Sequence, residues 1–564
     1  MAQDKLQKLE LTWIGKDEER EAIEPRILIE DPKYSYGDTE SGNMLIHGDN
    51  LLALKALEQE YSGKVKCIYI DPPYNTGSAF EHYDDGLEHS IWLSLMRERI
   101  QVLYNLLDKK EGTLWISLDD NEQAYCKVLC DEIFGRNNFI ANVIWEKKYS
   151  PQGNAQWLSD SHDFLIAYAR NKETWHPNLL PRTEEMNGRY KNWDNDPRGP
   201  WKPGDATISL SGGQRGAQFA RTGHSENIYE LVTPSGKRLY PPKGRCWYYP
   251  KEKMEEAIKN GIIFFGRDGQ GGPQMKRFLS TVKQGVAAMT IWKREEVGDN
   301  QEAKREVILF NSDSVFATPK PERLIERVLI LASNPGDFVL DSFLGSGTTA
   351  AVAQKMGRKY IGIELGNHAY THCYPRLKMV TDGTDQGGIS KAQNWKGGSG
   401  FKFYELAPSL LKEDKFGNLI INKEYNADML AAAMAKQEGY TYQPDATLYW
   451  KQGQSSEHDF IYTTTQFLTV ESLDAISETM QEGESLLICC TAFQKECTNH
   501  ANNITVKKIP QMLLGRCEFD KDDYSLNIID MPPLDLEEDL DDFPEEEPTA
   551  EAKDNKPVEG TLFD

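Results

Sequence analysis

Residues 44–74 read MLIHGDNLLALKALEQEYSGKVKCIYIDPPY and contain the pattern that decides the fold. A short apolar run ends at the turn of residues 48–50, and a helical period follows from Leu51 to Tyr61. The chain then enters the apolar run CIYI and leaves it at two prolines. Prolines donate no backbone hydrogen bond, so they cannot continue a central strand. The stretch therefore predicts a strand, a helix and a second strand with polar residues at the strand tips.

A second stretch with the same alternation lies far downstream. The helical segment PERLIERVLILAS, which starts at Pro321, precedes the strand DFVLD, the turn SFLGSG, the helix TTAAVAQKMG and the strand KYIGIE. Ligands of such α/β sheets bind in the crevice at the carboxyl ends of the strands. We therefore predict an α/β fold in which both stretches contribute to one cleft.

Length and composition limit the kind of protein. A chain of 564 residues is too long for one hydrophobic core, and 39% hydrophobic residues exclude wholesale disorder. No window approaches eighteen uncharged apolar residues, and the start is charged where a signal peptide is apolar, so we expect a soluble cytoplasmic protein without membrane contact. The nine cysteines form no paired CxxC site, so we expect reduced thiols and no metal.

Charge is distributed unevenly along the chain. The net charge is −24, but residues 518–564 alone contain 18 acidic and 3 basic residues, which predicts an acidic disordered tail. Residues 201–300 contain 16 Lys and Arg against 10 Asp and Glu. A basic middle on a Gly-rich, aromatic background favours a polyanionic partner, which the net charge alone would not suggest.

The motif Asp71-Pro72-Pro73-Tyr74 follows the buried strand directly. Two prolines hold one carboxylate, one carbonyl and one aromatic ring in a fixed shape at the strand end. Asp71 and the Pro72 carbonyl can accept the two hydrogens of an exocyclic amino group, and Tyr74 can stack on a flat base. The nitrogen lone pair is then freed for attack. The alternative is a surface turn with a tyrosine anchor.

The partner motif is DSFLGSGTT at residues 341–349, where a strand end passes into a helix. Its glycines allow close approach of a ligand to the backbone. Glu364 stands eighteen residues beyond Ser346 at the end of the next strand, where an acidic residue can hold ribose hydroxyls. The loop is not GxGxxG and no Lys precedes Thr348, so it favours a nucleoside ligand over a phosphate-cradling site.

The order of these motifs resembles that of the β group of amino-methyltransferases, which use S-adenosylmethionine on DNA bases. The resemblance is closest to the modification subunit of type III restriction-modification systems and covers roughly residues 41–385. The matching segments are HGDNLLALKAL (47–57), DPPYNTG (71–77), WISLDDNEQ (115–123), TPKPERLI (318–325) and DSFLGSGTTA (341–350).

The resemblance implies a Rossmann-like methyltransferase sheet with an inserted target recognition domain and a C-terminal α+β domain. It implies that the catalytic pocket consists of Asp71, Pro72, Pro73 and Tyr74. It implies that the cofactor S-adenosylmethionine is bound by Asp49, Lys320, Asp341, Phe343, Gly345, Ser346, Gly347, Thr348 and Glu364. For Asp49 a helix N-cap is an alternative, and both roles can hold at once.

We expect seven parts along the chain. They are an N-terminal segment (1–40), the catalytic half of the methyltransferase domain (41–150), the target recognition domain (151–304), the cofactor half (305–385), a linker (386–400), a C-terminal domain for partner or dimer contact (401–517) and the acidic tail (518–564).

The expected activity is methyl transfer to the exocyclic amino group of an adenine that is rotated out of duplex DNA. Cytosine is the alternative target, although enzymes that act there more often carry Ser at the position of Asp71. RNA or protein glutamine acceptors rank lower. A different interpretation is that the protein is mainly a specificity and docking subunit. On this interpretation it forms a homodimer that recognises DNA for a helicase-nuclease partner, and methylation is a secondary activity.

Overall fold

The structure, a computed structural model, describes residues 10–16, 22–75, 85–151, 157–211, 223–312, 316, 318–522 and 524. The chain forms two compact units, which are described separately. The first comprises residues 1–174, 291–326 and 335–564, and the second comprises residues 175–290 and 327–334.

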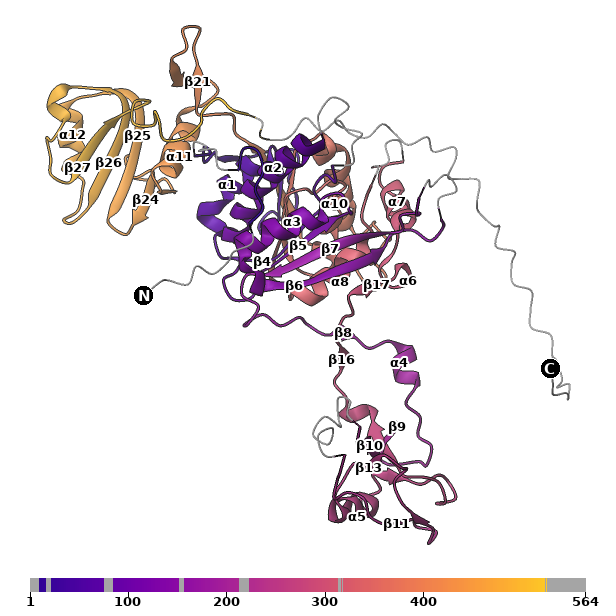
Figure 1. Cartoon of the computed structure of the whole chain (residues 1–564). Coiled ribbons are helices and arrows are strands. Elements are labelled where there is room, and N and C mark those ends of the chain that lie inside the picture. The colour runs from indigo at the N-terminus through magenta and orange to yellow at the C-terminus, as the bar shows by residue number, and fades with distance from the viewer. Residues whose placement is uncertain are drawn as a thin grey trace, which may run out of the picture. The chain divides into compact units, whose positions relative to one another are not determined.

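The first unit contains a sheet to which eleven of the described strands belong. Its order is β1-β20-β3-β19-β18-β4-β5-β7-β6-β17, with β2 paired to β20. The strands β4, β5, β7, β6 and β17 of this sheet are labelled in Figure 1. The strands from β20 to β5 run parallel, and β7 is antiparallel to both of its neighbours. The strand bounds are β1 Leu28–Glu30, β2 Tyr36–Gly37, β3 Met44–His47, β4 Val65–Ile70, β5 Thr113–Leu118, β6 Phe139–Glu146, β7 His162–Ala169, β17 Ile291–Trp292, β18 Phe338–Asp341, β19 Lys359–Glu364 and β20 Gly400–Leu406. The predicted α/β class is confirmed.

Helices connect the parallel strands in the expected order. Their bounds are α1 Asn50–Tyr61, α2 Asp85–Leu106, α3 Gln123–Cys130, α7 Asn300–Ile308, α8 Glu322–Ala332, α9 Thr348–Lys355 and α10 Tyr374–Asp382. Along the strand order, α1 connects β3 to β4 and α2 connects β4 to β5, whereas α9 connects β18 to β19 in the opposite direction. Because crossovers between parallel strands are right-handed, α1 and α2 lie on one face of the sheet and α9 lies on the other.

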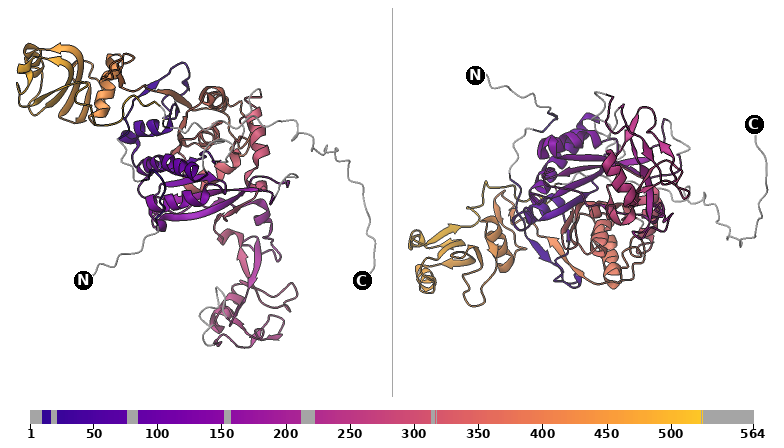
Figure 2. Two further views of the ribbon diagram at one scale, coloured as in Figure 1. Left: turned by 45° about the horizontal axis from the view of Figure 1, so that its top comes forward. Right: turned by 90° about the horizontal axis from the view of Figure 1, so that it is seen from below.

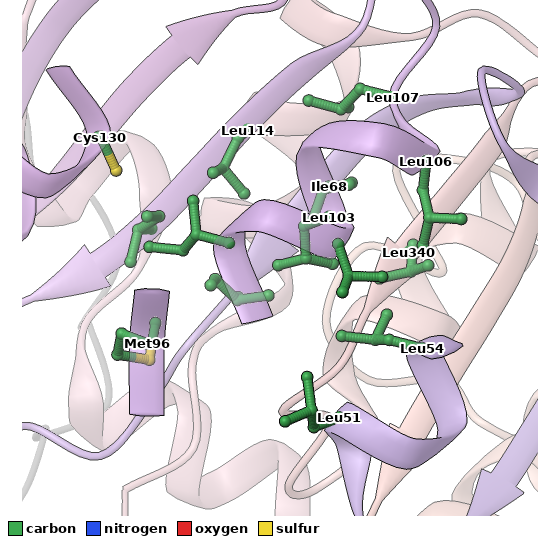
Figure 3. Packing of buried hydrophobic residues seen from close by; sticks show 14 of the residues in the cluster. Leu51, Leu54, Ile68, Met96, Leu103, Leu106, Leu107, Leu114, Cys130 and Leu340 are labelled. Carbon is green, nitrogen blue, oxygen red and sulfur yellow. The ribbon is translucent and has the colours of Figure 1, made fainter. Parts of the chain in front are cut away.

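The core lies between the sheet and the helices α1, α2 and α3. Leu51 and Leu54 from α1, Ile68 from β4 and Leu103 from α2 pack together with no more than 2% exposure (Figure 3). Burial of one such side chain contributes about 2 kcal/mol. The strand β4 is apolar at most positions because a parallel strand inside a covered sheet is buried on both faces.

Five strands of this sheet lie outside the two segments, 41–150 and 305–385, that we expected to form it, namely β1, β2, β7, β17 and β20. β7 falls within the expected recognition domain (151–304), yet it pairs with β5 and β6, so the boundary at 151 would cut a hairpin. β20 includes the last residue of the expected linker (386–400), yet it pairs with β3 in register from Lys402↔Met44 to Glu405↔His47. The sheet therefore extends beyond the expected boundary at residue 401.

The second unit consists of short strands and turns around a small aromatic core. Its elements are β8 Leu180–Pro181, α4 Glu184–Gly188, β9 Trp201–Asp205, β10 Thr207–Ser209, β11 Leu231–Val232, β12 Arg238–Leu239, β13 Arg245–Trp247, α5 Lys251–Lys259, β14 Ile263–Phe264, β15 Gln274–Phe278 and β16 Gly285–Val286. Within it, β9 pairs with β15, and Trp247 packs with Met254 and Phe265.

After β20 the chain builds a further sheet of five described strands, in the order β23-β24-β25-β26-β27. These orange and yellow strands lie side by side in both views of Figure 2. The bounds of this part are β21 Leu411–Glu413, β22 Leu419–Ile421, α11 Ala427–Gln437, β23 Thr441–Tyr442, β24 Gly453–Ser456, β25 Asp459–Leu468, α12 Val470–Ser477, β26 Ser485–Phe493 and β27 Ile504–Lys508. The mixed composition of helices and strands is as we predicted.

The first residues of the acidic tail are ordered against the first unit. The backbone amide of Glu518 donates to the carbonyl of Ala22, and Tyr524 packs against the main core. We predicted disorder for the whole of residues 518–564. Residues 525–564 of this tail lie outside the described part of the chain. Within the described part no helix is long and apolar enough to span a bilayer.

Candidate active site

The carboxyl ends of four neighbouring parallel strands bring the predicted residues to one edge of the sheet. Asp71 directly follows β4, Asp341 ends β18, and Glu364 ends β19. Asp49 lies two residues after β3, whose last residue His47 pairs with Glu364. The strand order β3-β19-β18-β4 therefore places Asp49 and Glu364, which are 315 positions apart in sequence, along the same edge as Asp71 and Asp341.

Asp71 is the centre of the catalytic motif. The hydroxyl of Tyr74 donates to its Oδ1 at 3.0 Å, and the ammonium of Lys320 donates to its Oδ2 at 2.6 Å. The Pro73 carbonyl accepts from the indole Nε1 of Trp92 at 2.8 Å, which fixes the two-proline turn against α2. Burial, aided by the charge of Asp71, raises the pKa of Tyr74 well above its ordinary value. Tyr74 is therefore a neutral ring and donor.

Lys320 belongs to the catalytic corner in this structure. We predicted it as a cofactor residue, but its Nζ binds Asp71 and lies 5.1 Å from the centroid of the Tyr74 ring. Its side chain is only 7% exposed. Lys320 therefore occupies one of the acceptor positions of Asp71, and the carboxylate keeps further lone pairs.

Asp163 and Lys147 are members of this corner that the sequence did not reveal. Lys147 Nζ lies 2.6 Å from Asp163 Oδ1 and 2.7 Å from Asp160 Oδ2. Burial raises the pKa of Asp163, against the charges of Lys320 and Lys147, which lower it. The segment SHD at residues 161–163 was the only signal in the sequence, and it gave no reason to prefer Asp163 over His162.

The glycine loop after β18 is organised by two carboxylates. Asp341 Oδ1 accepts from the amide of Phe343 at 2.9 Å, and its Oδ2 accepts from Thr349 Oγ1 at 2.6 Å. Glu364 Oε2 accepts from the amide of Gly345 at 2.7 Å, and its Oε1 accepts from Gly366 at 3.1 Å. Burial raises the pKa of Asp341 to about 7. Both residues thus shape the loop itself.

The backbone of this loop needs its glycines. Gly345 and Gly347 have φ angles of +55° and +83°, a region that residues with a Cβ rarely adopt. A Cβ on Gly345 would also lie 2.9 Å from the ring of Phe316, and one on Gly347 would lie 3.2 Å from Cys373 Cα. The loop therefore requires glycine at both positions, because of its backbone conformation and its close packing against Phe316 and Cys373.

A network of buried charged side chains holds the glycine loop in place. Arg376 donates to the carbonyl of Ser346 at 3.3 Å and to Thr348 Oγ1 at 2.8 Å. The same guanidinium lies 2.9 Å from Glu322, which Lys355 also binds at 2.8 Å. Nothing in the spacing of Arg376 from the loop marked it in the sequence. The network fixes the positions of the predicted residues Ser346 and Thr348.

Asp49 is the N-cap of α1, as the alternative interpretation had it. Its Oδ1 accepts from the amides of Leu51 and Leu52 at 2.9 and 3.1 Å. Its Oδ2 lies 3.5 Å from Arg99 and accepts from the amide of Tyr524 at 3.2 Å. The cap does not exclude a second role, because Asp49 remains beside Glu364 at the same sheet edge.

For the aromatic residues among the basic ones of residues 182–249, Phe219 included, the sequence allowed either contact with a ligand or a place in an ordinary core, and several of them are core residues. Trp201, Trp247 and Tyr190 are 1%, 2% and 7% exposed. Trp193 and Tyr240 are 45% and 62% exposed. Phe219, which belonged to the same prediction, lies outside the described residues. The aromatic composition of this unit therefore reflects its core more than a contact surface.

Some of the positive charge in the second unit is also neutralised within the unit. Lys276 binds Asp194 and Asp196 at 2.5 and 2.7 Å, and Arg198 binds Asp196 at 2.7 Å. Internal pairs lower the share of basic residues that can reach a phosphate. An excess of Lys and Arg in composition thus overstates the cationic surface.

Known proteins resemble this chain over much of its length. It is 33% identical over 414 residues to the probable type III restriction-modification enzyme HindVI Mod subunit of Haemophilus influenzae, 66% of this chain and 54% of that protein. It is 32% identical to the StyLTI Mod subunit of Salmonella typhimurium, over 60% of this chain and 55% of that protein. It is 26% identical to the EcoP15I Mod subunit of Escherichia coli, over 74% of both chains.

The chain thus spans about half the length of the first two of these relatives. The DNA methylase family profile matches residues 65–374, from the start of β4 to the start of α10. That match covers more than half of the chain and includes the ends of β4, β18 and β19. The chain therefore belongs to the DNA methylase family.

Proposed function

We propose that this protein transfers a methyl group from S-adenosylmethionine to the exocyclic amino group of adenine in duplex DNA. The observation that supports this most directly is the adjacency of β4 and β18, which register Leu340 opposite Ile68. One strand leads into Asp71 and Tyr74, and the other leads into the glycine loop. An amine acceptor and a nucleoside-type cofactor loop at neighbouring strand ends are what such a transfer requires.

The residues at this edge suit the proposed cofactor. When bound, S-adenosylmethionine supplies an electrophilic methyl group on a cationic sulfur. Asp71, Asp341 and Glu364 make the edge rich in carboxylates, which favours a cation. Gly345 and Gly347 leave the loop backbone without Cβ atoms. The loop of residues 343–348 and Glu364 would hold the cofactor, and Asp49 would border it.

Asp71 and Tyr74 prepare the amino group. The Asp71 carboxylate accepts one hydrogen of the amine and draws the nitrogen toward tetrahedral geometry, while the Tyr74 ring stacks on the base. Lys320 donates to Asp71 Oδ2, and the carboxylate keeps lone pairs for the entering amine. The nearby charge of Asp163 acts on the same ammonium and offers it another acceptor. The methylated amine loses one proton, which Asp71 can pass to water.

Adenine is the proposed target because Asp stands at the first position of the motif. Cytosine has an exocyclic amine of the same chemistry, and the geometry around Asp71 does not itself separate the two bases. Rotation of either base out of the stack costs a few kcal/mol, which contacts to phosphates and grooves must offset. We propose that the second unit supplies recognition of the DNA sequence through its exposed residues, such as Trp193 and Tyr240.

We further propose that the protein is the modification and recognition subunit of a type III restriction-modification system. On this proposal it forms a homodimer and contacts a helicase-nuclease subunit through its C-terminal part, which includes the sheet of β23–β27 and the acidic tail. The names of the Mod relatives support the assignment. Copurification of a large second subunit with the full chain would test it.

The methylated base tests the central proposal. The purified chain is incubated with S-adenosylmethionine and genomic DNA from a strain that lacks the protein, and the digested nucleosides are analysed by mass spectrometry. We expect N6-methyladenine, and sequencing of the same DNA returns the methylated site. N4-methylcytosine would support cytosine as the target, and absence of any methylated nucleoside would contradict the proposed activity.

A further inference from the structure

Two adjacent apolar side chains are exposed beside the proposed active site. Trp157 is 85% exposed and Leu158 is 93% exposed, and no other large apolar side chain in the described ranges is as exposed as either. Exposed apolar groups of this size are unfavourable in water unless a partner covers them. A neighbouring pair on one segment therefore indicates a surface that is buried in a complex.

The pair lies on the connection between β6 and β7. These two strands form a hairpin whose register ends with Glu146 opposite His162 (Figure 1). β7 in turn pairs with β5, Phe164 opposite Leu118, at the carboxyl end of that strand. Since β5 runs parallel to β4, the hairpin connection leaves the sheet at the edge where Asp71 lies.

The distance along the chain to the catalytic corner is short. Trp157 precedes Asp163 by six residues, which span at most about 20 Å when extended. Asp163 is close enough to Asp71 and Tyr74 for its charge to act on both. The apolar pair is thus within reach of a nucleotide whose base lies against Tyr74.

Cationic side chains surround the base of this hairpin. Lys147 and Lys148 follow β6, and Lys293 and Arg294 follow β17, which pairs parallel with β6. Lys293 is exposed and Lys148 is partly exposed, whereas Lys147 is paired with Asp160 and Asp163. Arg294 lies 4.1 Å from the ring of Tyr149, which is itself 73% exposed. Exposed apolar side chains close to cationic ones suit a polyanion whose apolar interior has been opened.

We propose that Trp157 and Leu158 insert into the DNA base stack and fill the space that the target base leaves when it rotates into the site. This inference rests on the proposed methylation of a base in duplex DNA. Unstacking exposes the faces of the neighbouring base pairs to water at a cost of a few kcal/mol. Insertion removes these faces and both side chains from water, so it lowers the free energy of the rotated state.

The experiment uses the full chain and a duplex that contains the methylation site found by sequencing, with 2-aminopurine at the target position. Its fluorescence rises when the base leaves the stack. We expect the double variant Trp157→Ala/Leu158→Ala to lose most of this rise. We also expect its methylation rate on the natural duplex to fall about tenfold or more, because 1.4 kcal/mol of lost stabilisation corresponds to a factor of ten.

A duplex with an abasic position opposite the target base distinguishes insertion into the base stack from a purely structural role of Trp157 and Leu158. When the target adenine faces an abasic position, no base pair has to break and rotation costs less free energy, so the double variant should lose much less of the wild-type rate on this duplex. Phe416→Ala is the matched control, because Phe416 is an exposed aromatic residue (75%) on the turn between β21 and β22, and it should behave as wild type on both duplexes.

Three results would overturn the inference. They are an unchanged fluorescence rise in the double variant, an equal loss of rate on both duplexes, and a loss of DNA binding with no difference between the duplexes. Failure of the proposed function is distinguishable from these, because the wild-type protein would then methylate neither duplex.

Discussion

The ends of β4 and β18 lie next to each other in the sheet, and each presents an aspartate, but the two carboxylates have different surroundings. Both oxygens of Asp341 accept hydrogen bonds from its own loop, from Phe343 and Thr349. Asp71 is held by the side chains of Tyr74 and Lys320, which can rotate away. Asp341 therefore shapes a backbone, whereas Asp71 presents an acceptor to a substrate. The same residue type at equivalent positions can thus build a site or act in it.

The largest expected effect comes from replacing the two aspartates separately. Asp71→Ala should lower the rate of methyl transfer by about 10³-fold, since the amine loses its acceptor, and leave cofactor affinity close to wild type. Asp341→Ala should weaken cofactor binding, because the loop loses both of its anchors. Single-turnover methyl transfer and calorimetric titration of S-adenosylmethionine measure the two quantities. Lost cofactor binding in Asp71→Ala would show that Asp71 also organises the loop.

A smaller effect distinguishes the ring of Tyr74 from its hydroxyl. Tyr74→Ala removes the stacking surface, which is worth about 1–3 kcal/mol for a base, so we expect a loss of about ten- to a hundredfold in kcat/KM. Tyr74→Phe removes only the hydrogen bond to Asp71, worth about 1 kcal/mol, so the loss should be a few-fold. Steady-state methylation of the mapped site measures both. Equal losses in the two variants would contradict a stacking role.

The parts of the fold that depend on short local patterns could be predicted from the sequence. The apolar run of β4, the two prolines after it and the glycine turn after β18 each determine their own conformation, so Asp71, Asp341 and Glu364 were placed correctly at strand ends. The parallel core of the sheet followed from the alternation of strands and helices.

What could not be predicted depends on pairing between distant segments. Lys320 and Asp71 are 249 positions apart, and no local pattern shows that they form an ion pair at 2.6 Å. Lys147 binds Asp163 only because β6 and β7 form a hairpin. β20 joined the sheet through pairing with β3, although the Gly-rich segment before it suggested a linker. Composition also left open whether Trp201 and Trp247 contact a ligand or form a core, because their burial is a property of the folded second unit.

A substitution in the glycine loop that follows β18 should have an effect of intermediate size on cofactor affinity. Gly345→Ala puts a Cβ at 2.9 Å from Phe316 and forces a residue into the left-handed region, which costs about 1–2 kcal/mol. We expect cofactor affinity to fall about tenfold, with the rate at saturating cofactor little changed. Calorimetric titration checks this. Gly336→Ala is the control, because its φ is +88° but no atom lies within 4 Å of the added Cβ.

A second variant separates the contact from the backbone strain. If the Phe316 ring causes part of the loss, Gly345→Ala/Phe316→Ala should bind the cofactor more tightly than Gly345→Ala. If the double variant binds no better, left-handed strain alone accounts for the effect. An affinity of Gly345→Ala equal to wild type would show that the loop tolerates a Cβ and would contradict its close approach to a ligand.

The smallest expected effect is on stability and concerns Asp341 without cofactor. Burial raises its pKa from the ordinary value of 3.8 to about 7, so between these pH values the folded protein retains a proton that the unfolded chain has lost. Its contribution to stability is therefore present at low pH and is lost as the pH rises through about 7. Asn cannot ionise and keeps one acceptor for the Phe343 amide. The melting temperature of Asp341→Asn relative to wild type should thus rise by a few degrees between pH 5 and pH 8, as measured by calorimetry. A difference that is constant with pH would show that Asp341 ionises as readily in the folded protein as in the unfolded chain, and that it stays charged beside Asp71 and Glu364.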